Sequence, residues 1–334
     1  MPFEERIDVH AHFLPPFYRE ACEKTGHGKP DGMPAVPEWS ARSHLALMKQ
    51  LNISKSIISI SSPGTYLVEG DNDAACKLNR QCNDYAAEFV SRHPSLLGFW
   101  GSLPLPDTAG ALQEIPYVLD TLKADGIILE TNHHGTYLGD SSLDIVFEEL
   151  NRRHAKVFIH PTTPYMQSCK GHGLTSAVTL PQYPNPMFEF MFDSARAVIN
   201  LFASGTVARC PNVTFIIPHA GGALPPLIER FTSFTAIIGG DQNLTSKVVK
   251  ETFAKQFYFD LAGFPFPDQI WGLLRYTGMD RLLYGSDSPF TPDGAVIRLA
   301  EAMTAEMNIW TKEERTAVLI GNASKMLEIG KGKL

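Results

Sequence analysis

Two histidines near the N-terminus are separated by a single residue. His10 and His12 follow an apolar run that begins at Arg6. In an extended strand, side chains at positions i and i+2 point to the same side. The two imidazoles would therefore lie close enough to bind one metal ion, and a complete site needs further ligands from elsewhere in the chain.

Other apolar runs also end in residues that bind metals or transfer protons: His160, His219 and Asp287. Three imidazoles and one carboxylate suit Zn²⁺, Mn²⁺ or a similar ion, with a position left open for water or substrate. A lone histidine at a strand end is more often a hydrogen-bonded core residue. The joint occurrence of His10, His12, His160 and Asp287 favours a metal site. His219 is either another ligand or a base and hydrogen-bond donor beside the metal, and we favour the second role.

Apolar runs of strand length alternate with helical patterns along the whole chain. Most of these runs are continuous, as expected for parallel strands that are covered on both faces. The predicted strands cover residues 6–10, 56–61, 97–102, 126–130, 156–160, 214–219, 257–261 and 281–287. The predicted helices cover residues 41–51, 71–92, 108–123, 141–153, 187–208, 223–237, 266–275, 295–306 and 312–319.

Eight strands alternating with helices predict an α/β fold, and the number eight favours closure into a (β/α)8 TIM barrel. An open, doubly wound sheet is the structural alternative. We expect one barrel domain over residues 1–334, because barrels of this length commonly form a single domain. The C-terminal strand ends would then bring the candidate ligands to one mouth. Insertions at residues 27–39 and 165–186 would lie over that face, either as lids and substrate walls or as tolerated surface loops.

The number of metal ions depends on the fourth strand, which ends at Glu130. A binuclear centre would want a bridging group there, often a carboxylated lysine. Glu130 is able to bind a second ion, but such a glutamate more often pairs locally or faces solvent. We therefore predict a single divalent ion, with Zn²⁺ expected and Mn²⁺ as the alternative.

Composition limits the class of protein. The 334 residues carry a formal net charge of -7, and no basic run or stripe suggests binding to nucleic acid or to an anionic membrane. The five cysteines form no CxxC pair, which favours free thiols in a reducing compartment. No window approaches eighteen consecutive apolar residues, and the charged N-terminus does not resemble a signal peptide. These features predict a soluble, cytoplasmic protein.

The ordered motifs resemble those of the amidohydrolase superfamily, and most closely its decarboxylase branch, typified by aminocarboxymuconate-semialdehyde decarboxylase. Within this branch the chain looks most like the fungal 6-methylsalicylate decarboxylases, with the isoorotate and γ-resorcylate decarboxylases as near relatives. The resemblance covers residues 6–327. It rests on His10-Ala-His12, His160-Pro161, His219-Ala-Gly-Gly, Gly285-Ser-Asp287-Ser-Pro-Phe290 and Gly321-Asn-Ala-Ser-Lys325.

The resemblance implies that His10, His12, His160 and Asp287 bind the metal and that His219 is a catalytic residue beside it. One departure concerns the substrate. The muconate-semialdehyde enzymes hold a second substrate carboxylate with an arginine on the helix after the first strand. Residues 43–48 contain no arginine, although one lies slightly upstream at Arg42. A monocarboxylic aromatic acid is therefore favoured over a dicarboxylate.

The implied reaction is non-oxidative decarboxylation of an ortho-hydroxy aromatic acid, with Asp287 as the acid that protonates the ring carbon. The expected substrate is 6-methylsalicylate, which would give 3-methylphenol and CO₂; salicylate, γ-resorcylate or isoorotate are alternatives. A metal-dependent hydrolase, such as a lactonase or amidase, is compatible with the same ligands. A metal-binding protein without catalytic activity is a further alternative.

Aromatic side chains near the predicted mouth are candidates for the substrate wall. We expect Phe290, Phe188, Phe192 and Tyr66 to contact a small aromatic carboxylic acid. The alternative for each is a place in the core or in a subunit contact. Because the relatives are commonly dimers or tetramers, the resemblance also implies a homodimer or homotetramer.

Overall fold

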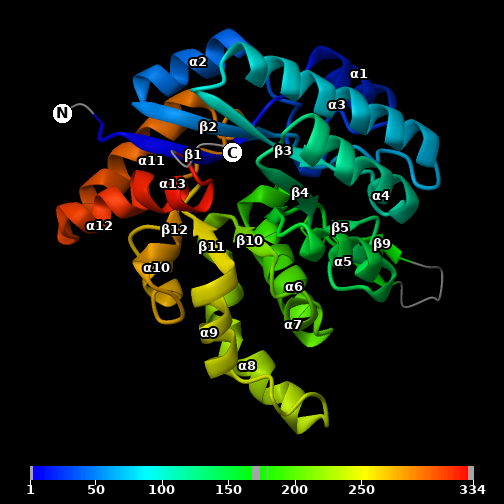
Figure 1. The fold of residues 1–334 in the computed structure, drawn as a ribbon, viewed down its shortest axis with the longest axis vertical. Helices are drawn as coiled ribbons and strands as arrows, with labels where there is room; N and C mark the ends of the chain where they lie inside the picture. The colour runs from blue at the N-terminus through cyan, green and yellow to red at the C-terminus, as the bar shows by residue number, and fades with distance from the viewer. Residues whose placement is uncertain (1–2, 168–173, 179, 330–334) are drawn as a thin grey trace.

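The computed structural model describes residues 3–167, 174–178 and 180–329. Its centre is one eight-stranded parallel sheet in the order β1-β2-β3-β4-β7-β10-β11-β12 (Figure 1). The strands are β1 (Arg6–His12), β2 (Ile53–Ser59), β3 (Leu97–Ser102), β4 (Gly126–Glu130), β7 (Lys156–His160), β10 (Thr214–Ile217), β11 (Phe257–Asp260) and β12 (Leu282–Leu283).

The first and last strands of this sheet lie side by side. Isolated parallel bridges join Asp8 to Tyr284 and Ala11 to Ser288. The Val9 amide donates to the Tyr284 carbonyl at 3.1 Å. The eight strands therefore form a nearly closed barrel, which confirms the predicted TIM-barrel class against the open sheet.

Helices cover the outside of the barrel, and α8 extends away from it (Figure 1). The longer ones are α2 (Ala41–Gln50), α3 (Asn72–Arg92), α4 (Thr108–Pro116), α5 (Asp144–Arg152), α6 (Glu189–Ala203), α8 (Leu224–Ile237), α9 (Ser246–Gln256) and α11 (Asp293–Glu306). Shorter ones are α1 (Pro16–Lys24), α7 (Thr206–Arg209), α10 (Gln269–Leu273), α12 (Lys312–Thr316) and α13 (Asn322–Met326).

Several predicted boundaries differ from the structure for local reasons. The helix predicted over residues 187–208 is divided at Gly205, whose φ of 77° interrupts it between α6 and α7. The strand predicted over residues 214–219 ends at Ile217 because Pro218 has no amide hydrogen to continue the ladder. The predicted strand 281–287 keeps only Leu282–Leu283 as β12. Helices α1, α9 and α13 were not predicted.

The barrel interior is a packed apolar core below the mouth. Trp100 and Phe158 are both almost fully buried there, and the Trp100 indole donates to the Val9 carbonyl at 2.9 Å. The ring of Phe158 packs edge-on against His10, with centroids 4.9 Å apart. The residues beneath the candidate site are therefore packed apolar side chains, and the barrel interior is a core rather than a pore.

The predicted insertions lie beside this mouth. Residues 27–39 include a short 3₁₀ turn, η1 (Pro30–Gly32). In the second insertion, β8 (Tyr165–Gln167) pairs antiparallel with β9 (Leu174–Ser176), while residues 168–173 and 179 lie outside the described part. Gly32, with φ 76°, approaches Pro184 so closely that an added Cβ would lie 3.3 Å from its Cα. The two insertions therefore pack against each other.

Among the described residues, no helix has both the length and the apolar character needed to cross a membrane.

Candidate metal centre and active site

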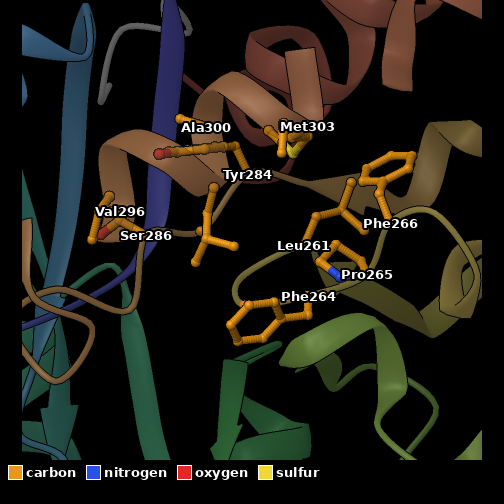
Figure 2. A pocket seen from close by; sticks show the side chains of 13 residues that line it. Leu261, Phe264, Pro265, Phe266, Tyr284, Ser286, Val296, Ala300 and Met303 are labelled. Atoms are coloured by element: carbon orange, nitrogen blue, oxygen red, sulfur yellow. The ribbon is translucent and has the colours of Figure 1, made fainter. Parts of the chain in front are cut away.

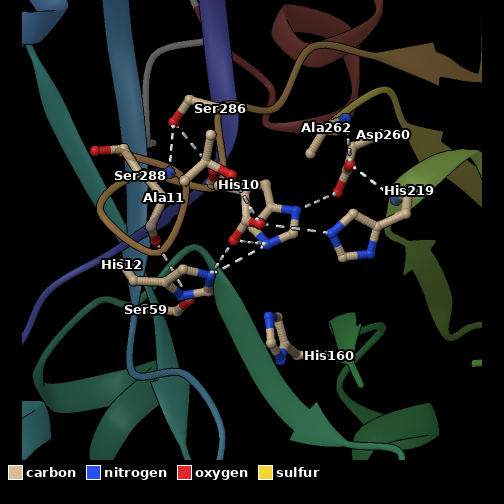
Figure 3. Close-up of polar contacts among 12 residues, drawn as sticks. His10, Ala11, His12, Ser59, His160, His219, Asp260, Ala262, Ser286 and Ser288 are labelled. Carbon is tan, nitrogen blue, oxygen red and sulfur yellow. Dashed lines mark hydrogen bonds and ion pairs between the residues drawn. The ribbon is translucent and has the colours of Figure 1, made fainter. Parts of the chain in front are cut away.

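Four predicted ligands meet at the mouth of the barrel. One ligand atom from each of His10, His12, His160 and Asp287 lies within 4.8 Å of the others. The Nε2 atoms of His10 and His12 are 3.1 Å apart, and Asp287 Oδ1 lies 3.4 and 3.3 Å from them (Figure 3). The three histidines are buried and the aspartate is partly buried. Within the described residues, no other group of three or more such side chains comes together in this way.

The hydrogen bonds of the ring nitrogens fit a metal site. His10 Nδ1 lies 3.0 Å from Asp260 Oδ2, and His160 Nδ1 lies 2.7 Å from the Pro161 carbonyl. His12 Nδ1 lies 3.2 Å from the Ser59 hydroxyl. An imidazole whose Nδ1–H donates to oxygen keeps a lone pair on Nε2 for a cation. The donor set therefore fits one divalent ion.

The loop after β12 holds Asp287 directly against β1. Asp287 has a left-handed backbone with φ 57°, and its amide donates to the His10 carbonyl at 2.7 Å. The Ser286 amide donates to Asp8 Oδ1 at 3.0 Å. Gly285 permits this contact, because a Cβ there would lie 2.8 Å from His10 Cβ. The Gly-Ser-Asp sequence thus fixes the carboxylate by close backbone approach.

Asp260, at the end of β11, is a residue of the candidate site that the sequence analysis did not single out. It is fully buried, and Oδ2 contacts His10 while Oδ1 accepts hydrogen bonds from the amides of His219 at 3.2 Å and Ala262 at 3.0 Å (Figure 3). One carboxylate therefore orients a metal ligand and the adjacent candidate catalytic residue. Its signal in the sequence is an aspartate that ends an otherwise apolar run, 257–260.

The charges of the site support cation binding. Burial alone would lower the pKa of His10, but Asp260 and then Asp287 raise it to about 10. Burial acts to raise the pKa of Asp287, yet hydrogen bonds from His10, His12 and His219 hold it well below its usual range. Burial likewise holds the pKa of His160 well below that of a free histidine. The ionised Asp287 carboxylate and the His12 and His160 imidazoles, whose pKa values burial lowers, suit a divalent ion, whereas His10 would have to release its proton to bind one.

His219 lies next to this cluster on a short 3₁₀ turn, η5 (His219–Gly221). Its Nε2 is 3.7 Å from Asp287 Oδ2, and its ring centroid is 5.2 Å from that of His10. The Gln269 amide holds the turn by donating to the carbonyls of His219 at 2.6 Å and Gly222 at 3.1 Å. The geometry thus places His219 beside the candidate acid, outside the four-residue group.

A cavity of about 360 Å³ opens beside the cluster, a size typical of small-molecule sites. Its polar lining is Asp31, Ser61, Ser62, His160, His219, Gln269, Asp287 and Thr291. The rest of its lining is Met33, Pro186, Met187, Phe190, Met191, Gly263, Phe264 and Phe290. None of these described lining residues is a lysine or an arginine.

The structure separates the four aromatic residues proposed for the substrate wall. Phe290 lines the cavity and packs edge-on against His12, with centroids 5.6 Å apart. Phe188 packs near Tyr183, and Phe192 is 46% exposed; neither lines the cavity. Tyr66 lines an adjoining cavity of about 210 Å³. Phe190, between Phe188 and Phe192 in the sequence, lines the cavity of about 360 Å³ instead.

Glu130 is buried behind His160, with Oε2 3.5 Å from His160 Nδ1. Burial raises its pKa well above that of a free glutamate. It does not belong to the four-residue group. Its placement gives no support to a second metal ion.

A smaller cavity of about 30 Å³ lies between the loop after β11 and helix α11 (Figure 2). Its lining is mostly apolar and includes Leu261, Phe266 and Met303. It shares the lining residues Gly263 and Phe264 with the cavity of about 360 Å³. None of the four candidate ligand residues lines this space.

Comparison with known proteins agrees with this architecture. A family model described as amidohydrolase matches residues 7–329. The chain belongs to this amidohydrolase family. It is 34% identical to a 6-methylsalicylic acid decarboxylase of Penicillium expansum, over 90% of each chain. These matches confirm the predicted superfamily branch and the carboxy-lyase class of enzyme.

Solved structures show the same fold. A crystal structure of an amidohydrolase superimposes with a TM-score of 0.86 at 32% identity and covers 97% of this chain and 100% of its own. A dihydroxybenzoic acid decarboxylase from a Polaromonas species, solved with manganese and 2-nitroresorcinol, gives a TM-score of 0.79 at 19% identity over 98% of each chain. The second likeness concerns the fold alone.

Proposed function

We propose that this enzyme removes CO₂ from a small ortho-hydroxy aromatic monocarboxylic acid without oxidation. The substrate that we favour is 6-methylsalicylate, which would yield 3-methylphenol. The single observation that carries the proposal is the His10, His12, His160 and Asp287 group at the edge of an aromatic-lined cavity. The 34% identity to a fungal enzyme named for that substrate supports the choice.

The same four residues would hold one divalent ion, with Zn²⁺ favoured from the ligand set and Mn²⁺ supported by the manganese in the Polaromonas structure. When bound, such an ion neutralises negative charge on the oxygens of the substrate and helps to orient them. The protein supplies the binding groups, a carboxylate that can carry a proton to the ring, and the cavity that holds the substrate.

The difficult step is breaking the ring–carboxylate bond, whose electrons lie in the plane of the ring. Asp287 would deliver a proton to the ring carbon that carries the carboxylate, forming a C–H bond and making that carbon tetrahedral. The C–C bond then breaks, CO₂ leaves, and the bonding electrons return to the ring. Because Asp287 is ionised in the resting site, it must first take a proton from the substrate hydroxyl or from water.

His219 would position this proton transfer. Its Nε2, 3.7 Å from Asp287 Oδ2, is close enough to stabilise the carboxylate after the proton has left. Asp260 holds the His219 amide, so the ring has a fixed starting position. The same arrangement would let His219 return a proton to Asp287 between turnovers.

The cavity lining supports a single carboxylate on the substrate. Phe190 and Phe290 offer aromatic faces or edges for the ring, while the lining provides no lysine or arginine for a second carboxylate. This agrees with the absence of an arginine in residues 43–48.

The decisive experiment combines metal analysis of the purified protein with a CO₂-release screen. The panel is 6-methylsalicylate, salicylate, γ-resorcylate and isoorotate, with an aryl lactone to test the hydrolase alternative. We expect about one divalent ion per chain and CO₂ release with at least one hydroxy acid. Opening of the lactone without CO₂ release from any acid would refute the proposal, and so would bound metal without any turnover.

We also propose that the enzyme is a homodimer or homotetramer. Apolar side chains are exposed at the end of helix α8, where Ile237 is 76% and Ile238 is 69% accessible. Figure 1 shows this end of α8 far from the barrel. Exposed apolar side chains at a projecting end are typical of a subunit contact. Analytical ultracentrifugation at micromolar concentration tests this, and a single monomeric species would contradict it.

A further inference from the structure

The cavity wall carries one acidic side chain that the proposed chemistry does not use. Asp31 lines the same cavity as His160 and Asp287, and the described lining offers no cationic side chain to neutralise it. We propose that Asp31 sets substrate specificity by accepting a hydrogen bond from a second donor group on the ring, such as a hydroxyl or an amine, and by excluding a second carboxylate. This inference rests on the proposed function and extends its substrate class beyond 6-methylsalicylate, whose second ring substituent is a methyl group, to acids that carry a second hydrogen-bond donor.

Hydrogen bonds hold the Asp31 carboxylate in place. The Thr163 hydroxyl donates to Asp31 Oδ1 at 2.6 Å, and the Asn185 amide donates to Thr163 Oγ1 at 2.8 Å. Asn185 is only 2% exposed, so this chain of bonds is anchored in the protein interior. Thr163 follows the ligand His160 by three residues, and the carboxylate is therefore fixed to the loop that also carries part of the metal centre.

The backbone of the first insertion adds to this rigidity. Asp31 adopts a left-handed conformation with φ 54° and ψ 28°, which L-residues other than glycine adopt infrequently. The next residue, Gly32, is also left-handed and packs against Pro184. A carboxylate that is held this firmly loses little conformational freedom when it binds a ligand.

Asp31 lies on the part of the cavity wall that is formed by the loops after β2 and β7. Asp31 lies with Ser61 and Ser62, which follow β2, and with Thr163, which follows β7. Gly263 and Phe264 follow β11, which is two places from β7 and three places from β2 in the closed strand order. A ring bound between these walls, with its carboxylate at the metal centre, has an edge that faces Asp31. A hydroxyl there would donate to the carboxylate, whereas a second carboxylate would meet a like charge in a confined space.

A purely structural role for Asp31 is the competing explanation, and the isosteric variant Asp31→Asn separates the two. The asparagine keeps an oxygen that accepts from Thr163, so a loop anchor would be preserved, but it removes the negative charge. Thr163→Val provides the complementary change, because it keeps the charge and loosens its position. Asp73→Asn, at an exposed position at the start of α3, is the matched control.

The experiment compares metal-loaded parent and variants on salicylate, on 2,3-, 2,4- and 2,5-dihydroxybenzoate, and on 4-hydroxyisophthalate, which carries a second carboxylate. Values of kcat/KM are measured together with dissociation constants from calorimetry. We expect the parent to prefer one dihydroxybenzoate over salicylate by about tenfold or more, and Asp31→Asn to lose most of that preference. The same variant should bind 4-hydroxyisophthalate about tenfold more tightly than the parent. Thr163→Val should reduce the hydroxyl preference while still excluding the dicarboxylate.

The binding data keep this inference separate from the proposed reaction. Asp31-dependent discrimination in binding without CO₂ release would support the specificity role and refute the decarboxylase proposal. CO₂ release with ratios in Asp31→Asn that stay within twofold of the parent would overturn the specificity role alone. A melting temperature and circular dichroism spectrum like those of the parent would show that the variant is folded.

Discussion

His10 and Asp260 form a buried pair in which Nδ1 lies 3.0 Å from Oδ2, at the base of the candidate metal centre. The pair joins the first strand of the barrel to the seventh, across 250 positions of the sequence. Its carboxylate also accepts the His219 amide. The orientation of a metal ligand and the position of a candidate catalytic histidine therefore depend on the same side chain.

Replacing Asp260 with asparagine should weaken metal binding without removing a ligand. The amide accepts a weaker hydrogen bond than the carboxylate and leaves His10 less basic, so we expect a loss of about 10- to 100-fold in metal affinity. Competition titration with a chromogenic chelator measures this. Asp268→Asn, at an exposed position a few residues further on, is the control and should bind metal like the parent. Equal affinities in the two variants would show that the pair does not support the ligand.

Replacing Asp287 with asparagine should separate metal retention from turnover. The asparagine oxygen can still face the metal, but the side chain can no longer deliver a proton. We expect some bound metal by mass spectrometry and a fall in kcat of about a thousandfold or more. Release of CO₂ at even a tenth of the parent rate would remove Asp287 from the role of acid.

Two phenylalanines of one short segment distinguish the cavity wall from the surface. Phe190 lines the cavity, whereas Phe192 is nearly half exposed. Phe190→Ala should lower kcat/KM by about tenfold, because it removes apolar contact with the substrate ring. Phe192→Ala should stay within twofold of the parent. The reverse pattern would mean that the substrate binds outside the cavity described above.

The buried His44 side chain should make the free energy of unfolding depend on pH, independently of catalysis. It is 4% exposed on α2, neither ring nitrogen has a hydrogen-bond partner among the described residues, and burial lowers its pKa from 6.5 to about 4. Below pH 6.5 the unfolded chain takes up a proton that the folded chain resists. The free energy of unfolding should therefore fall by about 1.4 kcal/mol from this residue between pH 7.5 and 5.5.

The variant His44→Leu tests that contribution. It should lose less stability than the parent over the same pH range, by about 1.4 kcal/mol in urea unfolding. His154→Asn, which removes an exposed histidine, is the control for the loss of a histidine as such. If His44→Leu and the parent respond alike to pH, then the ring is hydrated or hydrogen-bonded in solution.

The strands, and the four residues that meet at the mouth, were predictable because their signals are local or ordered along the chain. Continuous apolar runs indicated the eight strands. The pair of histidines indicated that the C-terminal end of the first strand provides candidate metal ligands. The left-handed backbones of His219 and Asp287, with φ 54° and 57°, were not predictable. They accompany contacts that form only when distant strands meet. The strand before His219 already ends ahead of Pro218, and the strand before Asp287 ends at Leu283.

The supporting residues were harder to find for a related reason. Asp260 looks like an ordinary strand terminus, and its partner lies far away in the sequence. The choice among Phe188, Phe190 and Phe192 depends on which side of a helix start faces the mouth. Positions four apart share one helix face and the residue between them points away from it. Periodicity shows this division but does not show which side meets the cavity.

The short segment after β12 completes the candidate metal centre, so that centre forms only when most of the chain is present. The Ser286 hydroxyl and the Asp287 amide both bond to the His10 carbonyl, and 276 positions separate Ser286 from His10. During synthesis, the first strand therefore leaves the ribosome long before the residues that close the barrel and complete the ligand set. A nascent chain that ends before Asp287 would lack one of the four ligands. Assembly of this candidate metal centre would thus be a late event of biosynthesis that occurs only when the barrel is complete.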